Sequence, residues 1–567
     1  MELAFIWVKE FQTMKNFSLN LSNTHKYNYD EKTRQLTRED NNELPSNFYG
    51  SDVSSLIGLF GRNGAGKTSC LKLIGSVMSG AKSRIKSDFI VVTRRKSDLI
   101  TCYYHYKDNP DVTPEPVFDG KCNKMKYSSS ITGLNTVFLS NTYDNSGLCF
   151  DKKIHDLSLK NRIGRKKEFL ENLSFMGSKS FINSSFYKNY DINVSIPKLT
   201  VPKFSKIENM LDQHSLIKDV IEGDYKIEET RILLKDVILK YNELFSSLPK
   251  SLTNQNLKKM FIYSNVLAEI SILIGLYRPR YSDVYEYVSC LNNAVDIDCV
   301  KNENLKIILN NIVDGFLKYT FKVKFKMSDA IRSRIKRIEN FLSLDIEEYN
   351  IYLDSSHKGD NSYIIKTKYS KKDINFIRQL PSSRVDLSFA NVSSGEQAML
   401  SLLSSLYQQL RTRRNATLIL LDEADLYLHP EWQLDFVSTM LKVLSSLNKS
   451  SVQVILTSHS PLIMTDFSRS NALMLETKNG DTSIVEIDIN PLGANLYDLY
   501  SHGFFLKERK VGSVAYEKIF GMLRDIESAS SYNDLGKPFL QTLELLGDDL
   551  TKVAIRRKLK EQGFEYD

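Results

Sequence analysis

The sequence predicts a mixed α/β fold in which one head is split by a mainly helical insertion. A glycine-rich loop from Gly61 to Thr68 lies between a short apolar strand and an apolar-faced helix. Two further apolar strands, 417–423 and 452–459, end in polar side chains much later in the chain. More than 300 residues separate the loop from the segment around Ser393, so we expect another unit between the two halves of the head.

The glycine-rich loop matches the pattern G-x-x-x-x-G-K-[ST] of a phosphate-binding loop. Backbone N–H groups of such a loop close around phosphate oxygens, and a lysine supplies positive charge to the β and γ phosphates. The Thr68 hydroxyl is suited to ligate Mg²⁺. The residues expected to bind the nucleotide here are Gly61, Asn63, Gly64, Ala65, Gly66, Lys67, Thr68 and Ser69.

The two later strands end in side chains that phosphoryl transfer requires. Asp422 can hold the Mg²⁺ shell, and Glu423 beside it can polarise the attacking water. His459 follows the next strand and is expected to reach the γ phosphate. Glu423 and His459 are therefore the predicted catalytic residues.

These segments resemble the Walker A, signature, Walker B and switch-histidine motifs of ABC-type ATPases, in particular the SMC-like and OLD-like branch that acts on nucleic acid. The signature is Val-Ser-Ser-Gly-Glu-Gln at 392–397, ahead of a helix predicted over 398–410. The resemblance implies that Ser393, Gly395 and Glu396 meet ATP bound by a second copy, in a homodimer or a higher assembly of dimers. His429 either belongs to the dimer-contacting loop of the family or caps a turn.

Within that branch, the sequence is most similar to the PtuA-type ATPases of Septu antiphage systems, including those encoded beside retrons. This resemblance covers the head motifs and the tail segments at 495–499 and 504–506. It implies an HNH nuclease partner and, for retron forms, a reverse transcriptase with its RNA-linked DNA. Phe504 and Phe505 are either core residues or the anchors of a docking site for that partner.

Two positions depart from the family pattern. The strand predicted at 136–140 ends in Ser140 and Asn141, where the family carries a glutamine that senses Mg²⁺. Asn141 is a secondary candidate for that ligand. The aromatic residue that stacks on adenine is not assigned, and Trp7, Phe11 and Phe17 are the candidates.

The insertion is predicted to be a compact helical arm. The apolar pattern is helical from about 206 to 280 and breaks near 250, which suggests a helical hairpin. Heptads are not sustained, so the long coiled coil of a true SMC protein is not expected. The predicted units are the first half of the head at 1–150, the insertion at 151–345, the second half of the head at 346–490 and a partner-docking segment at 491–567.

One stretch of the insertion is strongly basic and contains two phenylalanines. A basic run with aromatic residues fits contact with a nucleic-acid backbone, although a solvated basic face gives the same pattern. The candidate residues are Lys318, Lys322, Lys324, Lys326, Arg332, Arg334, Lys336 and Arg337.

Composition favours a cytoplasmic protein. The 567 residues are 42% apolar, carry a net charge of +8 and have six cysteines without a C-x-x-C pair, which argues against a zinc site or a disulfide framework. The N-terminus lacks the basic region of a signal peptide, and no apolar run is long enough to span a membrane.

The sequence thus predicts an ATPase subunit that uses ATP and Mg²⁺ and controls a separate HNH nuclease. No nuclease activity of its own is expected, because the Asp296 and Asp298 pair lacks the glutamate that a metal motif would need. The alternative is a DNA-repair or recombination ATPase that acts directly on DNA ends.

Overall fold

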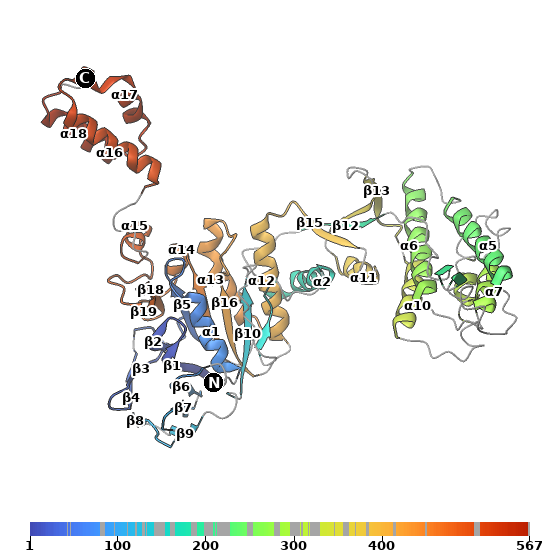
Figure 1. The fold of residues 1–567 in the computed structure, drawn as a ribbon, viewed down its shortest axis with the longest axis horizontal. Helices are drawn as coiled ribbons and strands as arrows, with labels where there is room; N and C mark the ends of the chain where they lie inside the picture. The colour runs from blue at the N-terminus through green and yellow to red at the C-terminus, as the bar shows by residue number, and fades with distance from the viewer. Residues whose placement is uncertain are drawn as a thin grey trace.

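The structure is a computed structural model that describes most of the chain. The residues outside the described part are 42, 46, 80–84, 96, 110, 119–121, 127–130, 132, 141–153, 159–164, 183–189, 198–207, 210, 213–226, 247–252, 277–283, 295–306, 308–309, 316, 318–328, 345, 355–361, 369, 381–384, 412–414, 448–450, 504–510 and 565–567. Figure 1 shows a head, a helical arm that reaches to one side of it and a group of C-terminal helices on the other side.

The head is built on one twelve-stranded mixed sheet, which confirms the predicted α/β fold. Its first six strands in spatial order run parallel to one another. The spatial order is β11 (Ile154–Asp156), β10 (Leu134–Ser140), β16 (Ala416–Asp422), β17 (Val452–Ser458), β5 (Val53–Phe60), β18 (Ala472–Lys478), β19 (Asp481–Val485), β2 (Met14–Asn20), β1 (Glu2–Phe11), β6 (Phe89–Arg94), β7 (Ile100–His105) and β9 (Cys122–Lys126).

Helices cover both faces of the parallel half, and its strands are accordingly apolar on both sides. Leu418 and Leu420 of β16 belong to the core that contains α1, whereas Ile419 and Leu421 belong to the core that contains α12 and α13. The helices of the head and of its junction with the arm are α1 (Lys67–Met78), α2 (Arg165–Met176), α3 (Lys179–Ile182), α11 (Lys371–Gln379), α12 (Ser394–Arg411), α13 (Pro430–Ser445) and α14 (Pro461–Met464).

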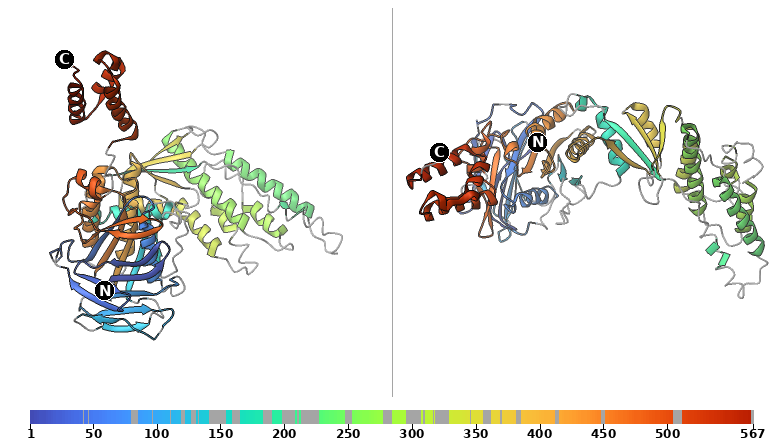
Figure 2. Two further views of the ribbon diagram at one scale, coloured as in Figure 1. Left: turned by 60° about the vertical axis from the view of Figure 1, so that its left-hand side comes forward. Right: turned by 90° about the horizontal axis from the view of Figure 1, so that it is seen from above.

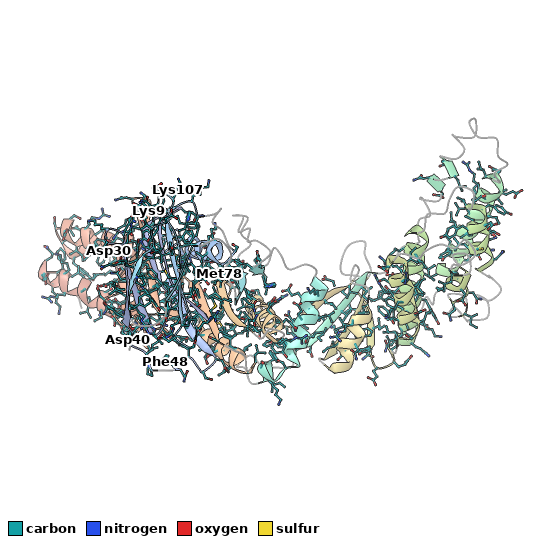
Figure 3. The ribbon with its side chains drawn as sticks, turned by 90° about the horizontal axis from the view of Figure 1, so that it is seen from below. Lys9, Asp30, Asp40, Phe48, Met78 and Lys107 are labelled. Atoms are coloured by element: carbon teal, nitrogen blue, oxygen red, sulfur yellow. The ribbon has the colours of Figure 1, made fainter. Side chains whose placement is uncertain are left out.

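The other half of the sheet, in which most pairs are antiparallel, carries a small three-stranded sheet on one face. Aromatic residues join the two, and Trp7 of β1 lies against Tyr29 with ring centroids 4.6 Å apart. The small sheet consists of β3 (His25–Asp30), β4 (Gln35–Asp40) and β8 (Glu115–Val117). In Figure 3 the labelled residues Lys9, Asp30, Asp40 and Lys107 lie in this lobe, away from the arm.

A second sheet, which the sequence analysis did not predict, joins the head to the arm. The strands β12 and β15 are adjacent and antiparallel although most of the insertion separates them in sequence. The sheet order is β13 (Asn350–Asp354), β14 (Ser362–Lys368), β12 (Asp191–Pro197) and β15 (Asp386–Ala390). The insertion is therefore helical at its far end and β-structured where it leaves the head (Figure 2).

The arm contains the helices that the sequence predicts, with a different pairing. α5 (Ile227–Ser246) and α6 (Asn254–Leu276) flank the break near residue 250. α5 packs mainly on α7 (Val284–Ala294), however, and α6 packs mainly on α10 (Asp329–Leu342). The two helices that flank the break therefore do not pack mainly on each other, and the main partner of each comes from later in the chain (Figure 1).

The C-terminal helices form a small unit with its own core. Met522, Phe539, Leu543, Ile555 and Leu559 are among its buried residues. Its helices are α16 (Ser513–Ser528), the 3₁₀ helix η4 (Tyr532–Leu535), α17 (Gly536–Leu545) and α18 (Asp549–Glu561). The preceding helix α15 (Leu496–Asp498) and the π-helix η3 (Leu499–Gly503) lie against the head instead, and Leu499 belongs to the core of the head. Among the described helices, none has both the length and the apolar character of a membrane span.

One buried amide links the two halves of the main sheet. β1 has an irregularity between Leu3 and Phe5. The Gln453 side chain of β17 accepts a hydrogen bond from Leu3 N–H at 2.8 Å and donates to the carbonyls of Leu3 at 2.7 Å and Leu21 at 3.0 Å. Gln453 is fully buried, so the amide and carbonyl of Leu3 depend on it rather than on water, whereas the Leu21 carbonyl also accepts from the Ser55 hydroxyl at 2.9 Å.

We expect Gln453→Met to lower the free energy of unfolding of the head by about 2–4 kcal/mol, because it leaves buried backbone groups without partners. Urea unfolding followed by hydrogen exchange at the Leu3 amide measures this, and exchange there should accelerate. Gln541→Met, on the exposed side of α17, is the control and should change stability by less than about 0.5 kcal/mol. Unchanged protection of Leu3 in Gln453→Met would contradict the assigned role.

Candidate nucleotide site

The phosphate loop connects β5 to α1 and depends on three glycines with positive φ. Gly61, Gly64 and Gly66 have φ values of 147°, 79° and 93°. A Cβ at Gly61 would lie 2.5 Å from the Leu475 carbonyl oxygen, so a side chain there would collide with backbone. The loop is therefore shaped by glycine in the way the sequence predicts. Asn63 and Gly64 are exposed at its tip, and Ser69 is half-buried in the first turn of α1.

Lys67 lies inside the loop with its ammonium group enclosed by acceptors. Its Nζ donates to the carbonyls of Gly61 at 3.1 Å and Arg62 at 3.2 Å, and lies 2.7 Å from Nε2 of His459. Burial lowers the pKa of Lys67 to about 8, and the carboxylates of Glu423 and Asp422 oppose that shift. A ligand that brings negative charge to this position would favour the protonated form.

Asp422 ends β16 beside the start of α1. Its Oδ1 accepts hydrogen bonds from the hydroxyls of Thr457 at 2.8 Å and Thr68 at 3.3 Å. Burial raises the pKa of Asp422, and the bond from Thr457 opposes the rise. A carboxylate and a hydroxyl are hard oxygen donors, and Mg²⁺ commonly takes one or two protein ligands and completes its shell with phosphate and water. Asp422 and Thr68 fit that requirement.

Glu423 follows Asp422 with a left-handed backbone at φ 46°. Its amide donates to Thr457 Oγ1 at 2.9 Å, and its Oε1 lies 3.3 Å from Nε2 of His459. The unusual φ directs the backbone away from the strand immediately after Asp422. The structure thus brings both predicted catalytic side chains, Glu423 and His459, to the same edge of the sheet as Lys67.

Thr457 is a site residue that the sequence analysis missed. It is fully buried in β17, and one hydroxyl both donates to Asp422 and accepts from the Glu423 amide. It therefore fixes the carboxylate of one residue and the backbone of the next. The only signal in the sequence is a threonine two positions before His459, where the strand would otherwise be expected to stay apolar.

The signature segment lies at the start of α12 and has an exposed front. Ser393 N–H donates to Glu396 Oε2 at 2.9 Å, and Glu396 N–H donates to Ser393 Oγ at 3.2 Å, which is a capping box. Gly395 packs closely, since a Cβ there would lie 2.6 Å from the Tyr427 carbonyl oxygen. Ser393 and Ser394 are exposed, and in this single copy the Glu396 carboxylate serves the helix cap.

His429 caps the helix that follows the strand of Asp422. It is the N-cap residue of α13, and its Nδ1 accepts a 3.4 Å bond from the amide of Glu431. Of the two roles considered for His429, the structure shows the cap. Tyr427, two residues earlier, is 62% exposed beside Gly395.

Several predicted residues lie outside the described part of the chain. In the basic stretch, Arg332 and Lys336 are exposed on α10, whereas Arg334 donates to buried Glu269 at 2.6 Å. Arg334 is thus engaged in an ion pair within the arm, and Arg337 is half-buried beside Ser333. The predicted residues that the structure does not describe are Asn141, Lys318, Lys322, Lys324, Lys326, Phe504 and Phe505, together with Asp296 and Asp298.

The three candidates for adenine stacking differ in how far their side chains are exposed. Trp7 is 1% exposed and Phe17 is 4% exposed, so both belong to the core. Phe11 is half-buried at the end of β1, next to the turn that leads to Met14. Of the three, Phe11 is the one whose ring a ligand can reach.

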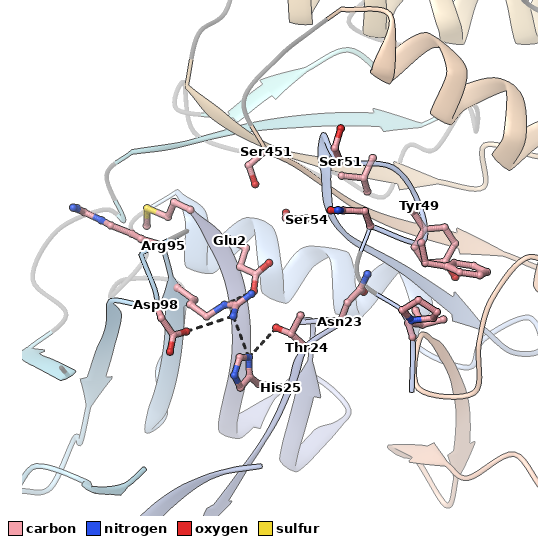
Figure 4. A pocket seen from close by; sticks show the side chains of 17 residues that line it. Glu2, Asn23, Thr24, His25, Tyr49, Ser51, Ser54, Arg95, Asp98 and Ser451 are labelled. Carbon is pink, nitrogen blue, oxygen red and sulfur yellow. Dashed lines mark hydrogen bonds and ion pairs between the residues drawn. The ribbon is translucent and has the colours of Figure 1, made fainter. Parts of the chain in front are cut away.

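A pocket of about 490 Å³ lies where β5 and β17 begin, at the opposite end of these strands from the phosphate loop, so it is not the nucleotide site (Figure 4). Val53 and Ser451, which line it, are at the starts of β5 and β17, whereas the phosphate loop follows the end of β5. A strand of this length spans roughly 20 Å or more. The pocket also contains Glu2, whose pKa burial raises.

Among the described residues, no group of three or more His, Cys, Asp or Glu side chains could hold a metal ion.

Comparisons with known proteins agree with the motifs. A family described as "AAA domain, putative AbiEii toxin, Type IV TA system" matches residues 313–465. The chain is 22% identical over 335 residues to the Retron Vc95 probable ATPase of Vibrio cholerae serotype O1 biovar El Tor, which covers 56% of this chain and 59% of that protein. It is 29% identical over 106 residues to the Retron Ec83 probable ATPase of Escherichia coli, covering 17% and 18%.

Both matches span less than two thirds of the relatives' own length. The solved structure of the SMC head bound to the C-winged helix domain of ScpA aligns with 86% of this chain and 97% of that chain, at 10% identity and a TM-score of 0.26. That score is too low to add to the argument from sheet order and site geometry. The chain is thus similar to two retron-associated probable ATPases, and the order of its motifs along one sheet agrees with the resemblance to ABC-type ATPases.

Proposed function

We propose that the chain binds ATP with Mg²⁺ and hydrolyses it at a site that two copies complete. The observation that supports this most directly is the convergence of Lys67, Thr68, Asp422, Glu423 and His459 at one edge of the sheet, with contacts of 2.7–3.3 Å. Phosphoryl transfer needs mainly positioning and charge compensation, which these side chains supply. The exposed signature serine residues support a role in closing the site of a second copy.

Each residue has a defined task in this proposal. Lys67 exchanges its carbonyl and histidine partners for phosphate oxygens. Thr68 and Asp422 would hold Mg²⁺, which would supply positive charge at the phosphates. Glu423 accepts a proton from the attacking water. His459, beside both Lys67 and Glu423, donates to the γ phosphate or orients that water. Thr457 keeps Asp422 and Glu423 in place.

We further propose that this ATPase is a cytoplasmic subunit of a retron-associated antiphage system and controls a separate HNH nuclease. The similarity to two retron ATPases and the resemblance to PtuA-type ATPases support this assignment. A reverse transcriptase and its RNA-linked DNA would then be further partners. The alternative, a DNA-repair ATPase, is distinguished by hydrolysis that broken DNA stimulates without any nuclease partner.

Substitutions at two positions should separate binding from turnover. We expect Lys67→Ala to weaken ATP binding by about 10- to 100-fold, because a charged hydrogen-bonding partner of the phosphates is lost. Glu423→Gln should retain binding and reduce turnover by about 10²-fold or more, because the phosphate loop is intact. Titration calorimetry and a phosphate-release assay measure the two quantities. Glu544→Gln, an exposed carboxylate on α17, is the matched control; wild-type turnover in Glu423→Gln would refute the catalytic assignment.

ATP affinity should fall as the pH rises through the pKa of Lys67. In the free protein that pKa is about 8, so Lys67 is mostly neutral above it. Phosphate favours the charged form, so binding above pH 8 requires proton uptake and becomes weaker by up to tenfold per pH unit. Calorimetry at pH 7 and pH 9 in buffers of different ionisation heat tests this. Equal affinity and no proton uptake at pH 9 would show that Lys67 is already charged in the free site.

The chain alone should cut no nucleic acid. The described residues contain no cluster of metal-binding side chains, and the proposed system assigns cleavage to another subunit. The test supplies the purified protein with ATP, Mg²⁺ or Mn²⁺, and single- and double-stranded DNA and RNA, with and without the HNH partner. Cleavage that survives repurification and disappears in Asp296→Asn or Asp298→Asn would place a nuclease inside the insertion.

A further inference from the structure

A row of three threonine hydroxyls connects the phosphate loop to two distant segments. Thr477 Oγ1 donates to the carbonyl of Gly64 at 3.2 Å, Thr482 Oγ1 lies 3.1 Å from Thr477 Oγ1, and Thr13 Oγ1 lies 2.8 Å from Thr482 Oγ1. Thr477 and Thr482 flank the turn between β18 and β19, and Thr13 lies in the turn between β1 and β2. These strands are neighbours in the sheet (Figure 1).

The direction of the three hydrogen bonds follows from their end point. A carbonyl oxygen only accepts, so the single hydroxyl proton of Thr477 is directed to Gly64. Thr477 must then accept from Thr482, and Thr482 must accept from Thr13. All three bonds therefore point toward the tip of the phosphate loop. Hydrogen bonds aligned in one direction polarise one another, so each one is strengthened by the others.

Thr482 is the rigid centre of this row. It is buried, and its backbone amide donates to the Thr13 carbonyl at 2.7 Å. It also fills the space in front of a loop glycine, because a Cβ at Gly66 would lie 2.7 Å from Thr482 Cγ2. The Thr482 side chain thus contacts the loop at Gly66 through its methyl group and acts on Gly64 through its hydroxyl and Thr477.

We propose that Thr482 is a positioning residue for the nucleotide: together with Thr477, it holds the phosphate loop in its binding shape before a nucleotide arrives. This inference rests on the proposed ATP site. Gly64 and Gly66 both have left-handed backbones, and a glycine loop without external support has many alternative conformations. If the loop is already ordered, binding does not have to bear the entropic cost of ordering it. Loss of the Thr482 hydroxyl should therefore lower the affinity for nucleotide.

The test is a double-mutant cycle on nucleotide affinity. Thr482→Val keeps the shape and removes the hydroxyl, and we expect it to raise the Kd for ATP about five- to tenfold with kcat within twofold of wild type. Thr482→Ser, which restores the hydroxyl, should recover most of the affinity. Thr477→Val should raise the Kd for ATP by a similar factor. The double Val variant should have a Kd no higher than either single variant, because each single substitution already interrupts the same row of hydrogen bonds.

A matched control breaks another link between the same strands. Lys15 of β2 pairs with Asp481 of β19 at 2.8 Å, and both side chains are more than half exposed. Lys15→Met should leave the Kd for ATP within twofold, because an exposed ion pair contributes little. Circular dichroism and thermal unfolding establish that all variants are folded.

The outcomes distinguish this inference from the proposed function. If the wild-type chain binds no ATP, the proposed function fails. If the wild type binds ATP and Thr482→Val binds equally well, or if the effects of Thr477→Val and Thr482→Val add in full, the positioning role is overturned while the ATP site stands. A loss of kcat without a change in Kd would also overturn it, since the row contacts no catalytic side chain described above.

Discussion

The site depends on the register of three adjacent parallel strands. Phe60 of β5 lies opposite Ser458 of β17, and Leu456 of β17 lies opposite Leu421 of β16. Because these strands end at one edge of the sheet, the residues that follow them meet although they come from distant parts of the sequence. A slip of one residue would turn Asp422 toward the opposite face. The side chains of β16 alternate between two packed cores, so such a slip would also require both cores to repack.

The sequence was sufficient for the parts of the site that obey local patterns. The phosphate loop, the strand that ends at Asp422 and the strand before His459 all have fixed spacing and apolar neighbours, and the structure has them within a few residues of their predicted bounds. Thr457 and Thr482 could not be identified in this way, because each acts on a segment far away in the sequence. Gln453 did leave a signal, since it is a polar residue in an otherwise apolar strand, but its partners in β1 depend on tertiary structure.

The insertion shows the same limit on a larger scale. Helices with long apolar stripes were predicted, whereas the pairing of α5 with α7 and of α6 with α10 was not. The strands β12 and β15 are short, and they pair although most of the insertion lies between them in sequence. The entropic penalty of closing a loop grows slowly, by about 0.6 kcal/mol for each doubling of length, so a head can accept a long insertion if its two ends meet. The sheet of β12 to β15 provides that meeting point.

The charges of the free site explain why a nucleotide with its metal ion suits it. Burial lowers the pKa of Lys67 and raises that of Asp422; the carboxylates of Glu423 and Asp422 oppose the first shift, and the hydrogen bond from Thr457 opposes the second. A triphosphate alone would bring more negative charge than Lys67 can offset, and a divalent cation bound with it would remove part of that charge. In the proposed cycle Mg²⁺ would therefore accompany ATP. Glu423 is already positioned, with its amide bonded to Thr457 and its backbone at an unfavourable φ. In the proposed dimer, the exposed signature serine of a second copy would complete the site.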